Sequence, residues 1–137
     1  MIVLNKLHHS DEQWEALAQM GDIGRVYMIN MFKFRQRAEY PDGRASDLSG
    51  VEAYGLYGLE TAKLLGEMGA TIAHSSELLG MIVGEVENLW DSMAIVDYPS
   101  LPQFMEMVES DAWQAHAIHR EAGLEGQLNI LARNPTG

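Results

Sequence analysis

Two histidines and an arginine near the end of the chain are the side chains best suited to move a proton or hold an anion: His116, His119 and Arg120. His116 and His119 stand three residues apart, a spacing that places both on one face of a helix. A histidine near its unperturbed pKa of about 6.5 can act as a general acid or base. An arginine can hold a carboxylate through paired N–H groups. We therefore take His119 and Arg120 as candidate catalytic residues.

The same residues also have simpler interpretations. With a carboxylate, the histidine pair could bind zinc or iron, but the chain has no His-Glu-x-x-His motif and no third ligand placed by sequence. We therefore expect no metal site. His116 is expected to be a solvated histidine on the helix surface. Arg120 could instead pair with Asp91 or Glu125 and tie its helix to the sheet.

Four aromatic residues and one amide are candidates for lining a pocket between sheet and helices. Rings with polar tips suit an aromatic or carboxylate-bearing ligand, and the candidates are Tyr54, Tyr57, Trp90 and Tyr98. Ordinary core packing is the alternative interpretation for each ring. Asn30 lies in an otherwise apolar strand, where a buried amide needs a partner. That partner is either a substrate carbonyl or a backbone group.

The composition excludes several classes of protein. The 137 residues carry 9 basic and 20 acidic side chains, for a formal net charge of −11, and 47% of them are apolar. The length fits one folded domain, residues 1–137. Such an acidic surface repels phosphate backbones and anionic membranes, so neither nucleic acid nor membrane is an expected partner. The chain has no cysteine and no apolar run that could span a bilayer, and we expect a cytoplasmic protein.

Hydrophobic periodicity and turn residues predict an alternating order of elements. Ser10, Ser49 and Ser100 are expected helix N-caps, and Gln13 and Gln103 complete capping boxes with the first and the last of them. The predicted elements are a helix from Ser10 to Gly21, a strand over Arg25–Phe34, a helix over Val51–Met68, two short strands or one bent strand over Ala70–Ser75 and Leu78–Val83, a strand over Trp90–Tyr98, a helix from Ser100, a helix that restarts at Ser110 and runs through roughly Glu121, and a strand over Gln127–Arg133. This order predicts an α+β fold, a ferredoxin-like βαββαβ sandwich with an extra N-terminal helix.

Two features of this pattern bear on function. Apolar residues occupy both faces of Arg25–Phe34 and of Trp90–Tyr98, so both faces of the sheet need cover. Helices supply one layer, and a partner subunit is the economical source of the other. The segment Arg35–Gly50 is a long loop, and long loops are often functional. We therefore expect a homodimer. The long loop either closes over a site through Arg35 and Asp42 or leaves these two side chains in solvent.

Several short motifs resemble the domain of unknown function 1330 family. They are Asn30–Phe34 with Arg35, Tyr40-Pro41, Ser49–Tyr54 with Tyr57, Glu87 with Trp90-Asp91, Tyr98-Pro99-Ser100, Phe104, Met107 and His119-Arg120. The resemblance runs from about Tyr27 to the last strand. It implies membership of the dimeric α/β barrel superfamily, in which two ferredoxin-like sheets face one another with their helices outside. That superfamily includes cofactor-free monooxygenases, lactone isomerases and haem enzymes, so the resemblance implies a fold rather than a reaction.

Three functional hypotheses follow. In the first, the protein is a small-molecule-binding protein or a cofactor-independent enzyme, monooxygenase- or isomerase-like. His119 then moves a proton, Arg120 and Asn30 hold an oxyanion or carboxylate, and no cofactor is needed. In the second, it is a non-catalytic ligand-binding or structural dimer, and its polar pocket groups are all used internally. In the third, it binds haem, with His74, His116 or His119 as axial ligand.

Overall fold

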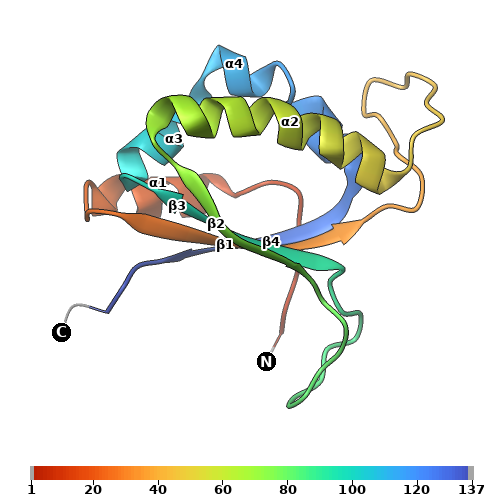
Figure 1. The fold of residues 1–137 in the computed structure, drawn as a ribbon, viewed down its shortest axis with the longest axis horizontal. Helices are drawn as coiled ribbons and strands as arrows, with labels where there is room; N and C mark the ends of the chain where they lie inside the picture. The colour runs from red at the N-terminus through yellow and green to blue at the C-terminus, as the bar shows by residue number, and fades with distance from the viewer. Residues whose placement is uncertain (1, 136–137) are drawn as a thin grey trace.

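The computed structural model describes residues 2–135 and has one layer of helices on one face of a four-stranded antiparallel sheet (Figure 1). The elements in chain order are α1 (Asp11–Met20), β1 (Val26–Phe34), α2 (Gly50–Met68), β2 (Thr71–Glu77), β3 (Ser92–Tyr98), α3 (Leu101–Glu109), α4 (Asp111–Gln114), α5 (Ala117–Gly123) and β4 (Leu124–Ala132). The strand order in the sheet is β2-β3-β1-β4. The predicted βαββαβ core with a preceding helix is therefore confirmed.

Serine caps start the long helices, as the sequence predicts. Ser10 accepts a hydrogen bond from the Gln13 amide, Ser49 accepts one from the Glu52 amide, and in both cases the third helical side chain returns the bond to the cap backbone. Each capping box satisfies two amides that the helix start would otherwise leave unpaired. At Ser100 only half of the predicted box forms, because the Ser100 hydroxyl, and not its amide, donates to Gln103.

The helix-facing side of the sheet forms the core. Along β1, buried residues alternate with half-buried ones, and Val26, Met28, Asn30 and Phe32 face the helices. Leu65 of α2 and Leu101 of α3 close over this face. Alternation with a period of two is what a strand produces when one face meets a packed layer and the other does not.

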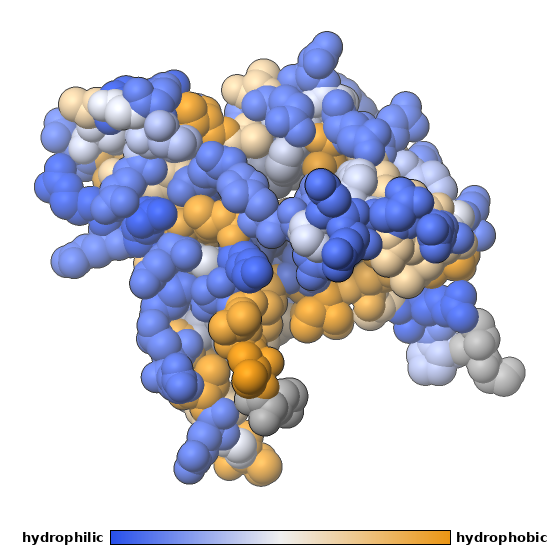
Figure 2. Space-filling view, turned by 180° about the vertical axis from the view of Figure 1, so that it is seen from behind, coloured by the Kyte–Doolittle hydropathy of each residue, from blue (hydrophilic) through white to orange (hydrophobic). Residues whose placement is uncertain are grey.

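The other face of the sheet has no helix over it (Figure 1). The strand register places side chains of β1, β3 and β4 next to one another there. The apolar members of this open face are Ile29, Met31, Met93, Ile95, Leu128 and Ile130. All are at least partly exposed. Figure 2 shows apolar atoms gathered along this underside and on the segments that extend below it.

The prediction of a strand over Leu78–Val83 is wrong. This stretch belongs to the irregular connection of residues 78–91 between β2 and β3, which we call the arm. Its β-branched and large apolar residues favour a strand, but no neighbouring strand among the described residues lies beside it to supply ladder hydrogen bonds. Gly80 and Gly84 interrupt it, and Gly84 has a φ of 90°. The arm extends from the sheet on the side away from the helices (Figure 1).

Two further boundaries differ from the sequence prediction. The helix expected from Ser110 through roughly Glu121 is two short helices, α4 and α5, because the chain turns at Ala115 and His116. The last strand begins directly at Leu124 rather than at Gln127. Its early start lets Leu124 pair with Phe34 beyond a register shift in β1. Gly123 is therefore the last residue of α5, and Gly126 lies inside β4.

The start of α2 and the end of α5 meet at two glycines. A Cβ on Gly50 would lie 2.7 Å from the Gly123 carbonyl oxygen, and one on Gly123 would lie 2.8 Å from the Tyr54 amide nitrogen. The two atoms nearest to each added Cβ belong to the backbone, so no flexible side chain can relieve these contacts. This backbone contact fixes α5, and hence His119 and Arg120, against α2.

We expect Gly123→Ala to lower the free energy of unfolding by about 1–3 kcal/mol, the usual range for overpacking. The matched control is Gly55→Ala in α2, where nothing lies within 4 Å of the added methyl group. That change should raise the free energy of unfolding by about 0.5–1 kcal/mol, because alanine favours the helix. Urea unfolding measures both. Equal effects of the two substitutions would contradict the close contact of α2 and α5.

Candidate functional site

The two histidines that stand out in the sequence do not share a helix face. His116 precedes α5 and is buried, with Nε2 3.0 Å from the Thr61 hydroxyl of α2. The prediction of a solvated His116 is therefore wrong, since the turn between α4 and α5 directs this ring into the protein. His116 links the end of α4 to the middle of α2.

His119 lies on the other side of α5, against the long loop of residues 35–49. Its Nδ1 is 2.7 Å from the Tyr40 hydroxyl, and the two rings meet edge to face. Tyr40 is buried, and the Arg44 guanidinium lies 4.7 Å from the centre of its ring. Partial burial lowers the pKa of His119, and the charges of Arg44 and His116 lower it further. The shift favours the neutral imidazole, whose Nδ1 shares a hydrogen bond with the Tyr40 hydroxyl.

Arg120 points away from His119, towards the sheet and the N-terminal segment. Its guanidinium donates to the Leu7 carbonyl and to Gln127 Oε1, both at 2.6 Å. The predicted alternatives, pairing with Asp91 or Glu125, are wrong: Asp91 accepts instead from Lys33 and from the Phe34 amide. Arg120 thus connects α5 to the N-terminal segment, which is distant in sequence, and to β4, which follows α5 directly.

The same network continues to Asn30. Gln127 donates to Asn30 Oδ1 at 2.8 Å, and the Asn30 amide donates to the carbonyls of Met28 and Ala94. The buried amide therefore has backbone and side-chain partners, as burial of a polar group requires. Together, Arg120, Gln127 and Asn30 form a chain of hydrogen bonds inside the subunit.

The candidate aromatic residues fall into separate groups. Tyr54 and Tyr57 have ring centres 5.3 Å apart, and the Tyr57 hydroxyl accepts from the indole of Trp113. Tyr98 packs edge to face on Phe104 in the core. Burial raises the pKa of both Tyr54 and Tyr98, so neither ionises near neutral pH. Tyr54 is the member of this group that lines the groove between α2 and the β2 side of the sheet.

Trp90 is placed differently from the sequence expectation. It precedes β3 instead of lying within it, and it is buried. Its indole Nε1 has no hydrogen-bond partner among the described residues. A buried indole N–H without an acceptor is uncommon in proteins.

A groove of about 390 Å³ lies between α2 and the β2 side of the sheet. Its lining residues are Phe32, Tyr54, Ser75, Ser76, Glu77, Ser92, Met93 and Ala94. Aromatic rings lie at one side and serine hydroxyls and a carboxylate at the other, which is the mixture that small-molecule sites use. The sequence analysis missed Ser75, Ser92 and Glu77. These residues come together only through the strand register, which pairs Ser75 with Ala94 and Glu77 with Ser92.

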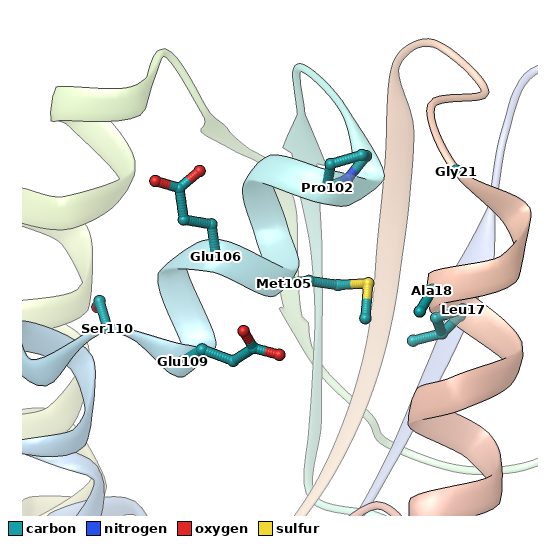
Figure 3. A pocket seen from close by; sticks show the side chains of 8 residues that line it. All are labelled: Leu17, Ala18, Gly21, Pro102, Met105, Glu106, Glu109 and Ser110. Carbon is teal, nitrogen blue, oxygen red and sulfur yellow. The ribbon is translucent and has the colours of Figure 1, made fainter.

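A second groove, of about 590 Å³, lies between α1 and α3 (Figure 3). Leu17 and Ala18 of α1 face Met105 of α3 across it. Glu109 stands at its edge, where it accepts a hydrogen bond from the Trp14 indole. No sequence-predicted site residue lies in this groove.

Within residues 2–135, no three histidine, aspartate or glutamate side chains gather closely enough to hold a metal ion. None of the helices in that range is both long enough and apolar enough to cross a membrane. His74, the third histidine considered as a haem ligand, is exposed on β2.

No family model matches the chain, and no curated protein matches it. Among solved structures, a protein of unknown function from Rhodopseudomonas palustris is similar over 98% of this chain and 100% of its own length, with a TM-score of 0.85 and 25% identity. The methylated form of that protein gives a TM-score of 0.86 and 27% identity over 98% of both chains.

Two more distant structures share the fold alone. One is a dimeric protein of unknown function with a ferredoxin-like fold from Bacteroides fragilis, with a TM-score of 0.50 and 13% identity over 82% of this chain and 99% of its own. The other is a dabb family protein with a ferredoxin-like fold from Mesorhizobium loti, with a TM-score of 0.51 and 14% identity over 83% of this chain and 99% of its own. The fold of this chain is therefore ferredoxin-like.

The lowered pKa of His119 predicts how stability depends on pH. Below the unfolded-state pKa of about 6.5, the unfolded chain takes up a proton that the folded chain does not. The His119 contribution is therefore fully present above that pH and is lost as the pH falls towards the folded pKa. We expect His119→Gln to reduce the loss of unfolding free energy between pH 7.5 and pH 5.5, measured by urea unfolding. A histidine NMR titration with a midpoint above 6.5 for His119 would contradict the assignment.

Proposed function

We propose that this protein is a homodimer of the dimeric α/β barrel type that binds a small aromatic ligand in the groove between α2 and the β2 side of the sheet. The resemblance to the domain of unknown function 1330 family supports the barrel assignment. So does the ferredoxin-like fold of its structural neighbours, one of which is described as dimeric. The groove, with its lining of aromatic and hydroxyl groups, carries the proposal of ligand binding.

The hydrogen-bond network favours binding over catalysis as the primary role. Asn30 and Arg120, the groups expected to hold an oxyanion, have all their identified contacts within the chain. Breaking such a network to receive a substrate would leave buried polar groups unpaired, which costs about 1–3 kcal/mol for each group. The free polar groups of the groove are instead Ser75, Ser92 and Glu77. They suit a planar ligand that carries hydroxyl or amino substituents.

Blocking the groove should abolish binding without unfolding the protein. Ser75 faces the groove from an exposed strand, so Ser75→Trp should fill the opening while the core stays intact. Binding of a panel of hydroxylated and amino-substituted aromatic compounds would be followed by NMR chemical-shift changes. We expect shifts at Phe32, Tyr54 and Ala94 in the wild-type protein and their loss in the variant.

The matched control is Ala62→Trp, on the exposed outer side of α2, which should bind like the wild type. Wild-type shifts that map to the α1–α3 groove, or that persist in Ser75→Trp, would contradict the assigned site.

A catalytic role for His119 is a second candidate, favoured by its short contact with Tyr40 and its lowered pKa. In this version the reaction takes place beside the 35–49 loop, and His119 moves a proton together with Tyr40. Replacing His119 with Gln should then abolish turnover of any compound that the protein converts, while the folded state persists by circular dichroism. Undiminished turnover in that variant would exclude His119 as the proton carrier.

A further inference from the structure

The arm carries the most exposed apolar side chains in the described part of the chain. Leu79, Ile82 and Val83 are 87%, 97% and 86% exposed. From Leu78 to Gly84 the sequence is LLGMIVG, without a charged residue. The base of the arm is fixed, because the Leu78 amide donates to the Asp91 carbonyl at 2.9 Å. An arm that is held at its base and exposes an apolar tip to water indicates a surface that another molecule covers.

A second copy of this chain is the occupant that fits best. The arm leaves the sheet on the same side as the open face (Figure 1), so it stands at the margin of the surface that the proposed dimer buries. The N-terminal segment, with Ile2 85% exposed, extends on that side as well. An anionic membrane surface would be repelled by the net charge of −11.

The length of the arm determines how far its tip reaches. Two packed sheets lie about 10 Å apart. The six residues from Leu78 to Val83, if extended, span up to about 20 Å. An arm of this length is long enough for its tip to reach one of the two edges of a facing sheet.

The two edges differ in whether they are already occupied. At the β4 edge, Lys6 and Gln127 form an antiparallel bridge, so the N-terminal segment covers this edge. The outer edge of β2 pairs with no strand of residues 2–135, and nearly all of β2 is exposed. A free strand edge is a template for another chain. It is also the side on which the groove lined by Ser75 and Glu77 opens.

We propose that the apolar tip of each arm lies along β2 of the other subunit and closes the ligand groove there. This inference rests on the proposed dimer and on the proposed groove, and it makes the site a shared one. Each groove then has Phe32 and Tyr54 from its own subunit on one side. On the other side it has Leu79, Ile82 and Val83 from the second copy. A planar aromatic ligand would be held between these two apolar surfaces.

Because the chain contains no cysteine, disulfide trapping tests this arrangement directly. The double variant Ile82→Cys/Ser75→Cys should form a covalent dimer as its major product on mild oxidation, seen on a non-reducing gel. The matched control Ile82→Cys/Glu125→Cys places the second thiol on β4, at the opposite edge, and should stay uncrosslinked. The single variants Ile82→Cys and Ser75→Cys should also stay uncrosslinked.

Sizing of the reduced variants separates the possible failures. A reduced protein that is dimeric but gives no Ile82–Ser75 cross-link overturns the arm proposal and leaves the proposed dimer standing. Cross-linking through Glu125, or of Ile82→Cys alone, also overturns it, since the tip would then lie elsewhere. A monomer at micromolar concentration contradicts both the proposed dimer and the arm. Absence of shifts at the groove residues of the wild-type protein, with the Ile82–Ser75 cross-link formed, would contradict the ligand site and leave the arm proposal standing.

Discussion

The rest of this structure depends on one constraint, the unequal covering of an antiparallel sheet. All helices of the described chain that contact the sheet pack on one face, where Val26, Met28 and Phe32 meet α2 and α3. The opposite face carries Ile29, Ile95 and Ile130, and no helix of residues 2–135 lies over it (Figure 1). Burying apolar surface contributes roughly 25 cal/mol per Å², so such a face strongly favours association. The proposed dimer, the proposed closing of the groove and the proposed role of the arm all rest on this one-sided covering.

The polar network inside the subunit serves this arrangement rather than a reaction. Arg120 contacts the Leu7 carbonyl and Gln127, and Gln127 contacts Asn30. The network holds the N-terminal segment against the β4 edge, which leaves β2 as the free edge. His119, the neighbour of Arg120, instead orders the long loop through Tyr40. His119 and Arg120 are neighbours in the sequence, which suggested a shared site. In the structure they lie on opposite sides of α5 and stabilise different parts of the chain.

The sequence predicts the fold well, because the fold depends on local and periodic signals. Ser10 and Ser49 mark helix starts, and the alternation along Val26–Phe34 marks a half-covered strand. The wrong predictions concern residues whose conformation depends on tertiary contacts. Leu79 and Ile82 read as a strand but have no strand to pair with, and His116 reads as a surface residue but turns inward to Thr61. The groove could not be predicted from the sequence, because it brings Tyr54 together with serines on two strands that are distant in sequence.

Sedimentation equilibrium of the purified protein tests the central claim, burial of the open face by a second copy, most directly. The predicted mass is twice the 15.3 kDa of one chain at micromolar concentration. Ile95→Asp, which places a charge in the middle of the open face, should return the mass to that of one chain. The matched change Leu59→Asp, on the exposed side of α2, should leave the dimer intact. A wild-type protein that sediments as a monomer would contradict the account.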